Sequence, residues 1–292
     1  MNMKENYRAQ QQIALSPEDT LTTTSAGAVI KLKGLVKQSL VSETRKVLQS
    51  ISNYINDIYK GRASLFVFEE LFGTKNTIYL LFQVETLQDY YDIMQIDMNC
   101  GPLRTIINDK ISGIVNDWSE LFESGTLASQ TLLPQFRRMY GANDSGTEMT
   151  FQKPLTGLPP AFHQFTLPLE NIIHSGNAGL MIHREAQLKY EFRSEGRQFA
   201  RDVVDSINTK ARGEATAFLY EEAFGNADKI HWLIHMDKID SYYPLIQIHA
   251  ADPEVRELYF KETLPKEKGG GNWSKMFVEG SMKDNSFVPQ IW

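Results

Sequence analysis

The sequence predicts an α+β protein in which two tandem βαββαβ repeats pack sheet to sheet as one intramolecular α/β barrel. The first observation is an internal duplication, because residues n and n+152 match without a gap from Ala26 to Arg104. The second is the order of strand and helix patterns, which is the same in both copies. The third is the length of 292 residues, which accommodates two units of about 110 residues each.

Short matching blocks define the duplication. The segment Phe66–Gly73, FVFEELFG, matches Phe218–Gly225, FLYEEAFG, and a Tyr-Tyr pair follows each block. After a shift of three residues the match resumes around Trp118 and Trp273. Because a duplicated half must fold as a unit, both copies are assigned the same elements. Differences between the copies then indicate where one half was specialised.

The first copy contains four predicted strands and two helices. The helix over Ser42–Tyr59 begins at a serine N-cap, carries apolar residues at helical spacing, and ends before Gly61. A short polar turn after Gly73 predicts a hairpin between the second and third strands. A second helix begins near Thr86 or Leu87. The predicted strands are Ala28–Val36, Ala63–Glu70, Thr77–Val84 and Leu127–Phe136.

The second copy repeats this order, beginning with a strand over Leu180–Leu188 and ending with one over Met282–Ile291. Four prolines and no clear periodicity predict an irregular connector between the copies. We therefore expect an N-terminal arm over residues 1–25, a first repeat over 26–136, a connector over 137–177, and a second repeat over 178–292 that carries the site.

Composition narrows the class of protein. A net charge of −6 and a pI near 5.6 argue against a nucleic-acid partner, which requires a basic surface. There is no apolar run of about 18 residues to cross a membrane. The single cysteine, Cys100, excludes an internal disulfide framework, and the N-terminus lacks the apolar core of a signal peptide. We expect a cytoplasmic monomer or homodimer that acts on a small-molecule substrate.

The order of elements is that of the ferredoxin-like fold. With the two FVFEELFG-type blocks and the Tyr-Tyr helices, the chain resembles the dimeric α/β-barrel superfamily in tandem-fused form. That superfamily includes antibiotic-biosynthesis monooxygenase-like, EthD-like, NIPSNAP-like and chlorite-dismutase-like haem proteins. The chain also resembles an uncharacterised bacterial family associated with natural-product gene clusters. These resemblances imply an architecture, whereas function depends on the site.

Histidines are confined to the second part of the chain. All six lie after residue 160, and four fall within the second repeat. Side-chain alternation places His183 and Glu185 on the same interior face as His231 and His235 of the adjacent strand. The first copy has Lys31, Tyr79 and Gln83 opposite the three interior histidines, so we expect these residues to form the facing wall.

The second strand of the second copy adds a carboxylate to this face. We expect Glu222 to lie beside His231, with Phe218 beside His235. A register slip of one residue would present Glu221 instead.

These residues predict a metal site formed by His183, His231, His235 and Glu222. Imidazole and carboxylate together suit Fe, Mn, Ni, Cu or Zn, and an open coordination position makes such a site catalytic. The catalytic residues would be Glu222, Glu185 and Tyr79. The expected reaction is an oxygenase, lyase or isomerase step on a biosynthetic intermediate.

Three alternatives remain. Either His231 or His235 acts as a general base without a metal. The chlorite-dismutase-like resemblance implies a haem enzyme, with His249 near the second helix as the haem ligand. The third alternative is a non-catalytic ligand-binding or scaffold barrel, in which the interior histidines are buried and hydrogen-bonded to protein.

Overall fold

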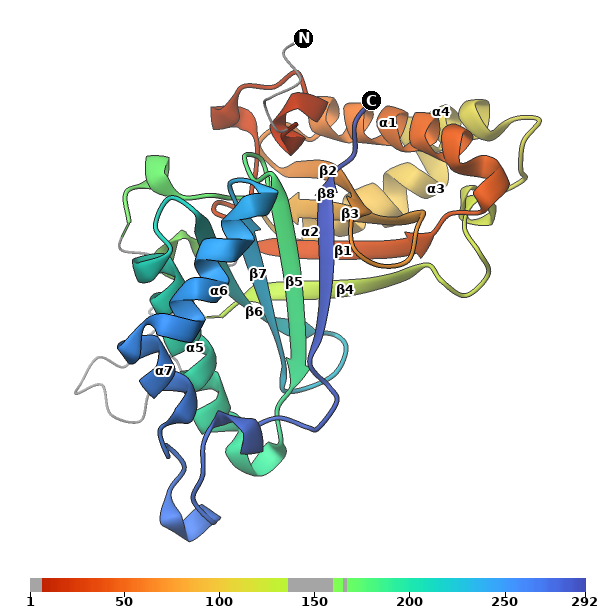
Figure 1. The fold of residues 1–292 in the computed structure, drawn as a ribbon. Helices are drawn as coiled ribbons and strands as arrows, with labels where there is room; N and C mark the ends of the chain where they lie inside the picture. Colours follow the sequence, from red (N-terminus) through yellow and green to blue (C-terminus); the bar gives the residue numbers. More distant parts are fainter. Residues whose placement is uncertain (1–6, 136–159, 165–166) are drawn as a thin grey trace, which may run out of the picture.

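The computed structural model describes residues 7–135, 160–164 and 167–292 (Figure 1). The first half comprises β1 (Ala28–Leu35), α1 (Val41–Ile58), β2 (Ala63–Glu70), β3 (Thr77–Val84), α2 (Leu87–Tyr91), α3 (Met98–Cys100), α4 (Pro102–Ile111) and β4 (Ala128–Pro134). The second half comprises β5 (Leu180–Gln187), α5 (Arg193–Lys210), β6 (Ala215–Ala223), β7 (Lys229–Met236), α6 (Tyr242–Ala251), α7 (Pro253–Phe260) and β8 (Lys283–Pro289).

The predicted elements agree closely with those observed. The ranges of β2 and β3 are confirmed without change, and the other predicted strands differ by one or two residues at their ends. The predicted second helix is broken in both halves. In the first half a π-helical turn over Asp92–Asp97 follows α2, and in the second half Pro253 begins a separate helix. Phe136 and most of the predicted connector lie outside the described residues.

The predicted fold class, two ferredoxin-like repeats packed sheet to sheet as an α/β barrel, is wrong. All eight strands belong to one closed antiparallel β-barrel, in the order β1-β3-β2-β8-β5-β7-β6-β4. Strand β4 pairs with β6 from Thr131↔Ala223 to Pro134↔Tyr220, and β2 pairs with β8 from Phe68↔Pro289 to Glu70↔Phe287. Closure pairs the strand edges that two separate sheets would leave open.

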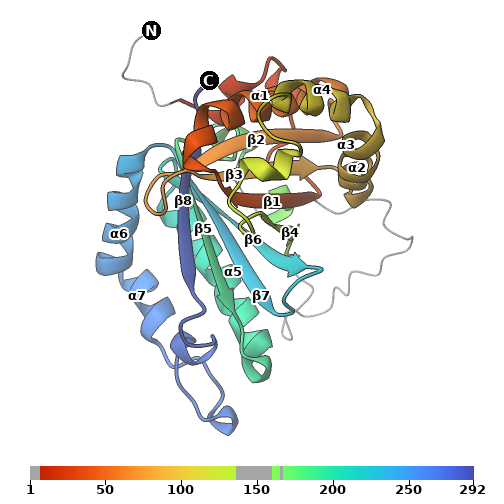
Figure 2. The same ribbon diagram turned by 90° about the vertical axis from the view of Figure 1, so that its right-hand side faces the viewer.

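The helices lie outside the barrel (Figures 1 and 2). Helices α1 and α4 pack on the first-half strands, and α5, α6 and α7 cover the second-half strands. A third apolar cluster, which includes Phe66, Phe218 and Phe287, fills part of the barrel interior. Among the described residues, no helix is long and apolar enough to cross a membrane.

Two glutamine side chains bond to the strand backbone close to the seams of the barrel, which are the pairs β2–β8 and β4–β6 that join the two halves. The Gln12 side chain accepts a hydrogen bond from Val67 N (3.0 Å) and donates one to Val67 O (2.7 Å). Gln164 does the same to Leu219, at 2.9 and 2.7 Å. Both pairs are related by the 152-residue offset, so the duplicated pattern reaches upstream of Ala26. The described part of the N-terminal arm is therefore bonded to the barrel.

Replacing Gln12 or Gln164 with Ala should destabilise the protein by about 1–3 kcal/mol each, because a buried strand N–H loses its partner, while the carbonyl beside it keeps a backbone donor, Gln290 N on Val67 and Gln135 N on Leu219. Urea unfolding measures the change. The matched control is Gln11→Ala, since the Gln11 side chain is exposed. Equal destabilisation by Gln11→Ala and Gln12→Ala would contradict a role for these amides at the seams.

Candidate functional site

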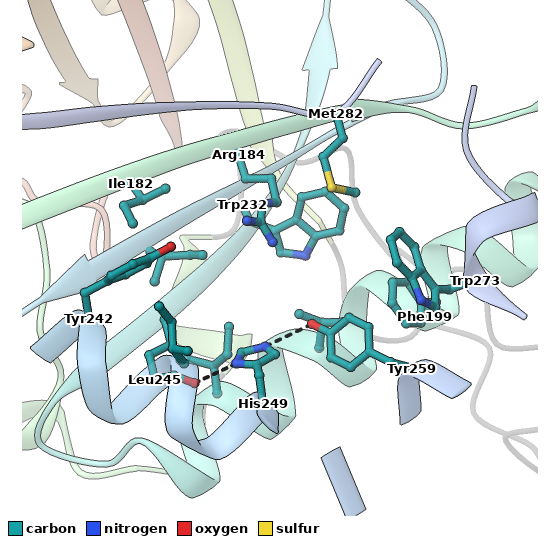
Figure 3. A pocket seen from close by; sticks show the side chains of 14 residues that line it. Ile182, Arg184, Phe199, Trp232, Tyr242, Leu245, His249, Tyr259, Trp273 and Met282 are labelled. Carbon is teal, nitrogen blue, oxygen red and sulfur yellow. Dashed lines mark hydrogen bonds between the residues drawn. The ribbon is translucent and has the colours of Figure 1, made fainter. Parts of the chain in front are cut away.

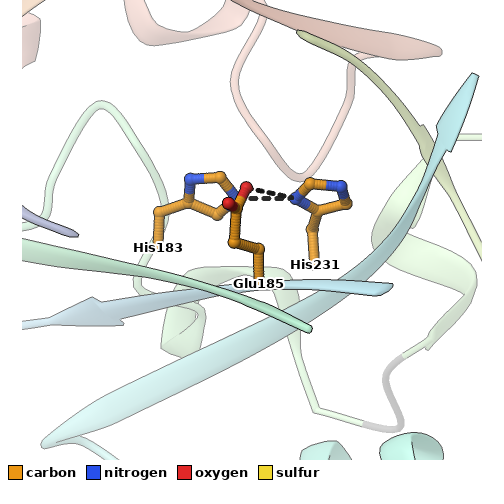
Figure 4. Close-up of side chains that lie close together, drawn as sticks. All are labelled: His183, Glu185 and His231. Carbon is orange, nitrogen blue, oxygen red and sulfur yellow. Dashed lines mark hydrogen bonds and ion pairs between the residues drawn. The ribbon is translucent and has the colours of Figure 1, made fainter. Parts of the chain in front are cut away.

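Strands β5 and β7 bring three of the predicted residues together inside the barrel. Glu185 is paired in register with His231, and His183 lies two residues along the same strand face. His183 Nε2 lies 2.8 Å from His231 Nδ1, and the two rings stack with centroids 5.1 Å apart. Figure 4 shows the Glu185 carboxylate beside both imidazoles. The ligand atoms of the three residues all lie within 4.8 Å of one another.

The strand β6 contributes Glu222. The observed register pairs Tyr220 with His231, two residues away from the predicted pairing. A shift of two residues keeps the same side chains inward, so Glu222 Oε2 lies 3.2 Å from His231 Nε2. Glu221 points to the other face and forms an ion pair with Arg197 of α5 at 2.8 Å. Glu222, rather than Glu221, therefore belongs to the interior cluster.

The first half contributes a lysine. Lys31 Nζ lies 2.7 Å from His183 Nδ1, and Lys31 is 4% exposed while both histidines are fully buried. A protonated lysine only donates, so His183 Nδ1 then accepts and His183 Nε2 donates to His231. A chain of polar groups thus runs from Lys31 through His183 and His231 to Glu222, and the two halves of the barrel share it.

Both carboxylates are held by neighbouring polar side chains. Glu185 Oε2 accepts hydrogen bonds from Gln130 Nε2 at 2.9 Å and lies 3.1 Å from Lys229 Nζ. Glu222 Oε2 lies 3.3 Å from the same amide and 3.5 Å from the same ammonium. Gln130 and Lys229 are only partly buried, so this polar layer lies between the buried histidines and solvent. We call Lys31, Gln130, His183, Glu185, Glu222, Lys229 and His231 the interior cluster.

The other two predicted site residues are His235, which lies farther along β7, and Tyr79, whose ring centroid lies 5.8 Å from Lys31 Nζ. His235 is four residues from His231, which is about 13 Å along a strand. It contacts Thr23 Oγ1 at 3.2 Å and the Phe218 ring instead. The Tyr79 hydroxyl lies within hydrogen-bond distance of the Glu70 carboxylate and of Asn285 Oδ1, and its one proton is donated to either. Sequence alternation assigned the correct face to both side chains, but a shared face does not give a shared site.

Burial sets the protonation states of the interior cluster. It lowers the pKa of Lys31 to about 7 and holds the pKa of His183 well below its ordinary value. Burial also lowers the pKa of His231, although Glu222 opposes the shift. The contact with His231 lowers the pKa of Glu222 to about 2. For Glu185, burial raises the pKa, but hydrogen bonds from Gln130 and other groups outweigh it and leave the pKa lowered. Near neutral pH both imidazoles are therefore uncharged and both carboxylates are anionic.

The donor set fits a divalent transition metal. Neutral imidazole and carboxylate are the forms that bind metals. A metal held by both rings would replace the hydrogen bond between His183 Nε2 and His231 Nδ1, so the proton in that bond would have to move to the outer nitrogen of His183. The buried His231 Nε2 has no aligned hydrogen bond among the described residues despite its approach to Glu222. A small reorientation of this ring therefore breaks no well-formed bond on that side.

The sequence did not predict the pocket on the outer face of β5 and β7, under α5, α6 and α7 (Figure 3). Its volume is about 180 Å³. His249, the predicted haem ligand, lines it, with Nδ1 2.8 Å from Leu245 O and Nε2 3.1 Å from the Tyr259 hydroxyl. Sites for drug-sized ligands have about 300–1,000 Å³, so the pocket in this conformation does not accommodate a haem.

A closed antiparallel barrel with outer helices and a buried histidine, lysine and carboxylate cluster defines the class: a barrel with a candidate small-molecule site in its interior. The chain belongs to DUF6039, a family of unknown function, whose sequence profile matches residues 2–292. A search of curated proteins by sequence finds no match.

Solved structures share this fold at low identity. A candidate monooxygenase from Fusobacterium nucleatum subsp. nucleatum ATCC 25586 is 12% identical, with a TM-score of 0.53 over 92% of this chain and 93% of the other. A second, from Lactobacillus acidophilus NCFM, is 9% identical, with a TM-score of 0.51 over 90% and 93%. An anthrone oxidase-like protein is 8% identical, with a TM-score of 0.50 over 93% and 94%. These likenesses support the predicted structural resemblance to monooxygenase-like barrels, whereas the natural-product association stays a prediction.

The stability of the protein should decrease as the pH decreases, because His235 is buried in its uncharged form. Burial lowers its pKa from 6.5 to about 3, so the unfolded chain binds a proton that the folded chain excludes between these values. The contribution of His235 to the free energy of unfolding is fully present above pH 6.5. Below pH 6.5 it is lost by about 1.4 kcal/mol per pH unit. Urea unfolding of wild type and His235→Leu from pH 7 to 5 should give a shallower loss in the variant. Parallel slopes would contradict the assignment.

Proposed function

We propose that this protein is a small-molecule enzyme whose active site is the interior cluster, with a divalent transition metal bound by His183, His231 and a carboxylate. The observation that carries the proposal is the meeting of two uncharged imidazoles and the Glu185 carboxylate inside the barrel, with ligand atoms within 4.8 Å of one another. Glu222, anionic and 3.2 Å from His231, is a further ligand or the base.

The groups around these ligands are arranged as outer partners of a metal site. Ligating histidines usually bond through their second nitrogen to a fixed partner, and ligating carboxylates are themselves hydrogen-bonded. Glu185 is bonded by Gln130 and paired with Lys229, and His183 has Lys31 on its other nitrogen, which accepts the N–H of a metal-bound His183 only as the uncharged amine. Because the pKa of Lys31 is about 7, this neighbour carries only part of a positive charge near neutral pH.

The chemistry follows from the roles these residues can fill. A bound divalent metal supplies Lewis acidity, or redox chemistry if it is Fe, Mn or Cu. Glu222 accepts a proton from a substrate held near His231, while Gln130 and Lys229 bind its polar groups at the partly exposed layer. Tyr79, bonded to Glu70 and Asn285, serves as wall rather than acid. The reaction is an oxygenase, lyase or isomerase step on a biosynthetic intermediate, and the likeness in fold to candidate monooxygenases favours the oxidative class.

Purified wild-type protein should contain one divalent metal per chain, measured by elemental analysis. His231→Ala should lose it. The matched control is His235→Leu, on the same strand and interior face but bonded to Thr23, which should retain the metal. A wild type that takes up no metal, even after incubation with each candidate ion, would sink the metal-dependent proposal and favour general-base catalysis or a non-catalytic barrel.

Neighbouring glutamates provide a second test. Glu222→Gln should weaken Co²⁺ binding by about 10–100-fold, the range found for supporting groups of metal sites. Glu221→Gln should leave Co²⁺ affinity unchanged, because Glu221 pairs with Arg197 on the helix side. Visible absorption of the Co²⁺ complex measures both affinities. Equal affinities of the two variants would count against Glu222.

The haem alternative stays a prediction. After expression with a haem supplement, absorption spectroscopy decides it, because a bound haem gives a Soret band. The small pocket beside His249 leads us to expect none.

A further inference from the structure

The pocket on the outer face of β5 and β7 is separate from the interior cluster. Arg184 and Trp232 line it, and they alternate along their strands with His183 and His231, which point inward. The sheet backbone therefore lies between the two places. The lining is largely apolar and includes five aromatic side chains, and Figure 3 shows Trp232, Trp273 and Tyr259 around the same space.

The first half provides a comparison within the same chain. Its equivalent location holds a cavity of only about 10 Å³, against about 180 Å³ in the second half. The two linings correspond through the duplication: Leu32 with Arg184, Leu80 with Trp232, Phe82 with Ile234, Met94 with Ile246, and Trp118 with Trp273. The architecture thus permits a filled core at this place, and the second half departs from it.

Four replacements distinguish the open pocket from the filled one. Ile234 stands where the first half has Phe82, which removes a ring, and Trp232 stands where it has Leu80, which adds one. Arg184 stands where it has Leu32. His249 stands where it has Asp97, a residue that bonds to Tyr59 and to the backbone of Leu103. The second half therefore has more space at this location, gains the polar side chain of Arg184, and has an imidazole in place of a carboxylate.

The polar groups leave hydrogen-bonding capacity at the pocket. Arg184 uses Nε and one terminal nitrogen on Asp284, at 2.8 and 2.7 Å, and the other terminal nitrogen has no hydrogen-bond partner among the described residues. His249 Nδ1 is engaged by Leu245 O. Its Nε2 accepts a hydrogen bond from the Tyr259 hydroxyl in this structure, so a ligand hydroxyl bonds to His249 only by displacing Tyr259, whereas Arg184 is free to donate.

We propose that this pocket binds a small planar aromatic molecule of one or two rings that carries a hydroxyl or carbonyl group. A closed apolar cavity of about 150 Å³ is known to hold benzene, so about 180 Å³ suits one or two rings. Trp232 and Trp273 give flat apolar walls, and Arg184 or His249 bonds to the polar group. Access is from the α6 side, where Tyr242 is 43% exposed and Ile246 46% exposed. This inference stands independently of the metal proposal.

The test is isothermal titration calorimetry of the full-length protein with 2-naphthol, with naphthalene as the probe that lacks the hydroxyl. We expect saturable 2-naphthol binding at one site and at least tenfold weaker naphthalene binding. Ile234→Phe, which restores the residue of the first half, should weaken 2-naphthol binding at least tenfold. Should that variant fail to fold, Ile246→Trp narrows the pocket from its partly exposed rim and should have the same effect.

The matched control is Tyr243→Ala on the same helix. Tyr243 is 70% exposed and does not line the pocket, so its variant should bind 2-naphthol as wild type does. Absence of saturable binding, or undiminished binding by both pocket-filling variants, would overturn the proposal. Metal content is measured in the same samples. It should be unchanged in Ile234→Phe, so failure here is distinguishable from failure of the metal site.

Discussion

Closure of the barrel is the constraint on which the rest of the structure depends. Neither half has a closed sheet of its own, because β2 and β4 find one neighbour each in the other half. Where strand pairing at the seam ends, a buried glutamine amide bonds to the strand backbone at Val67 and again at Leu219. An unpaired strand edge inside a folded protein is costly, and separating the two halves would leave the edges of β2, β4, β6 and β8 without these partners.

Closure also brings titratable residues of both halves together in one interior. Once the eight strands surround one interior, Lys31 of the first half and His183 of the second lie 2.7 Å apart. The low dielectric of the interior suppresses charge on every titratable group that lacks a partner. The histidines and Lys31 respond with lowered pKa values, whereas Glu222 stays anionic because it is paired. A site with uncharged bases beside charged acids is thus a consequence of burial.

Much of this arrangement follows from sequence, and the exceptions have physical reasons. Period-two alternation correctly places His183, Glu185 and His231 on one face. It also points Glu222 inward, because the register differs from the predicted one by two residues and side chains alternate every second residue. Alternation has no information on distance along a strand, so it does not separate His235, which contacts Thr23 and Phe218, from the histidines of the interior cluster. It also cannot show whether two sheets remain separate or close, because that depends on backbone pairing between halves. The matching Gln12 and Gln164 are visible in the sequence, and a longer comparison of the copies would have found them.

The duplication is most informative where the two copies fold alike but differ in what they enclose. The first half shows that the helix-covered face can be packed almost without space, with Phe82 and Leu32 in the core. An equivalent location that is open and carries Arg184 and His249 loses apolar contacts that the fold is able to make. Because the first half fills this location with side chains, the barrel architecture does not require the open pocket of the second half. The proposed aromatic ligand would restore those contacts, in the same half that supplies the histidines of the interior cluster.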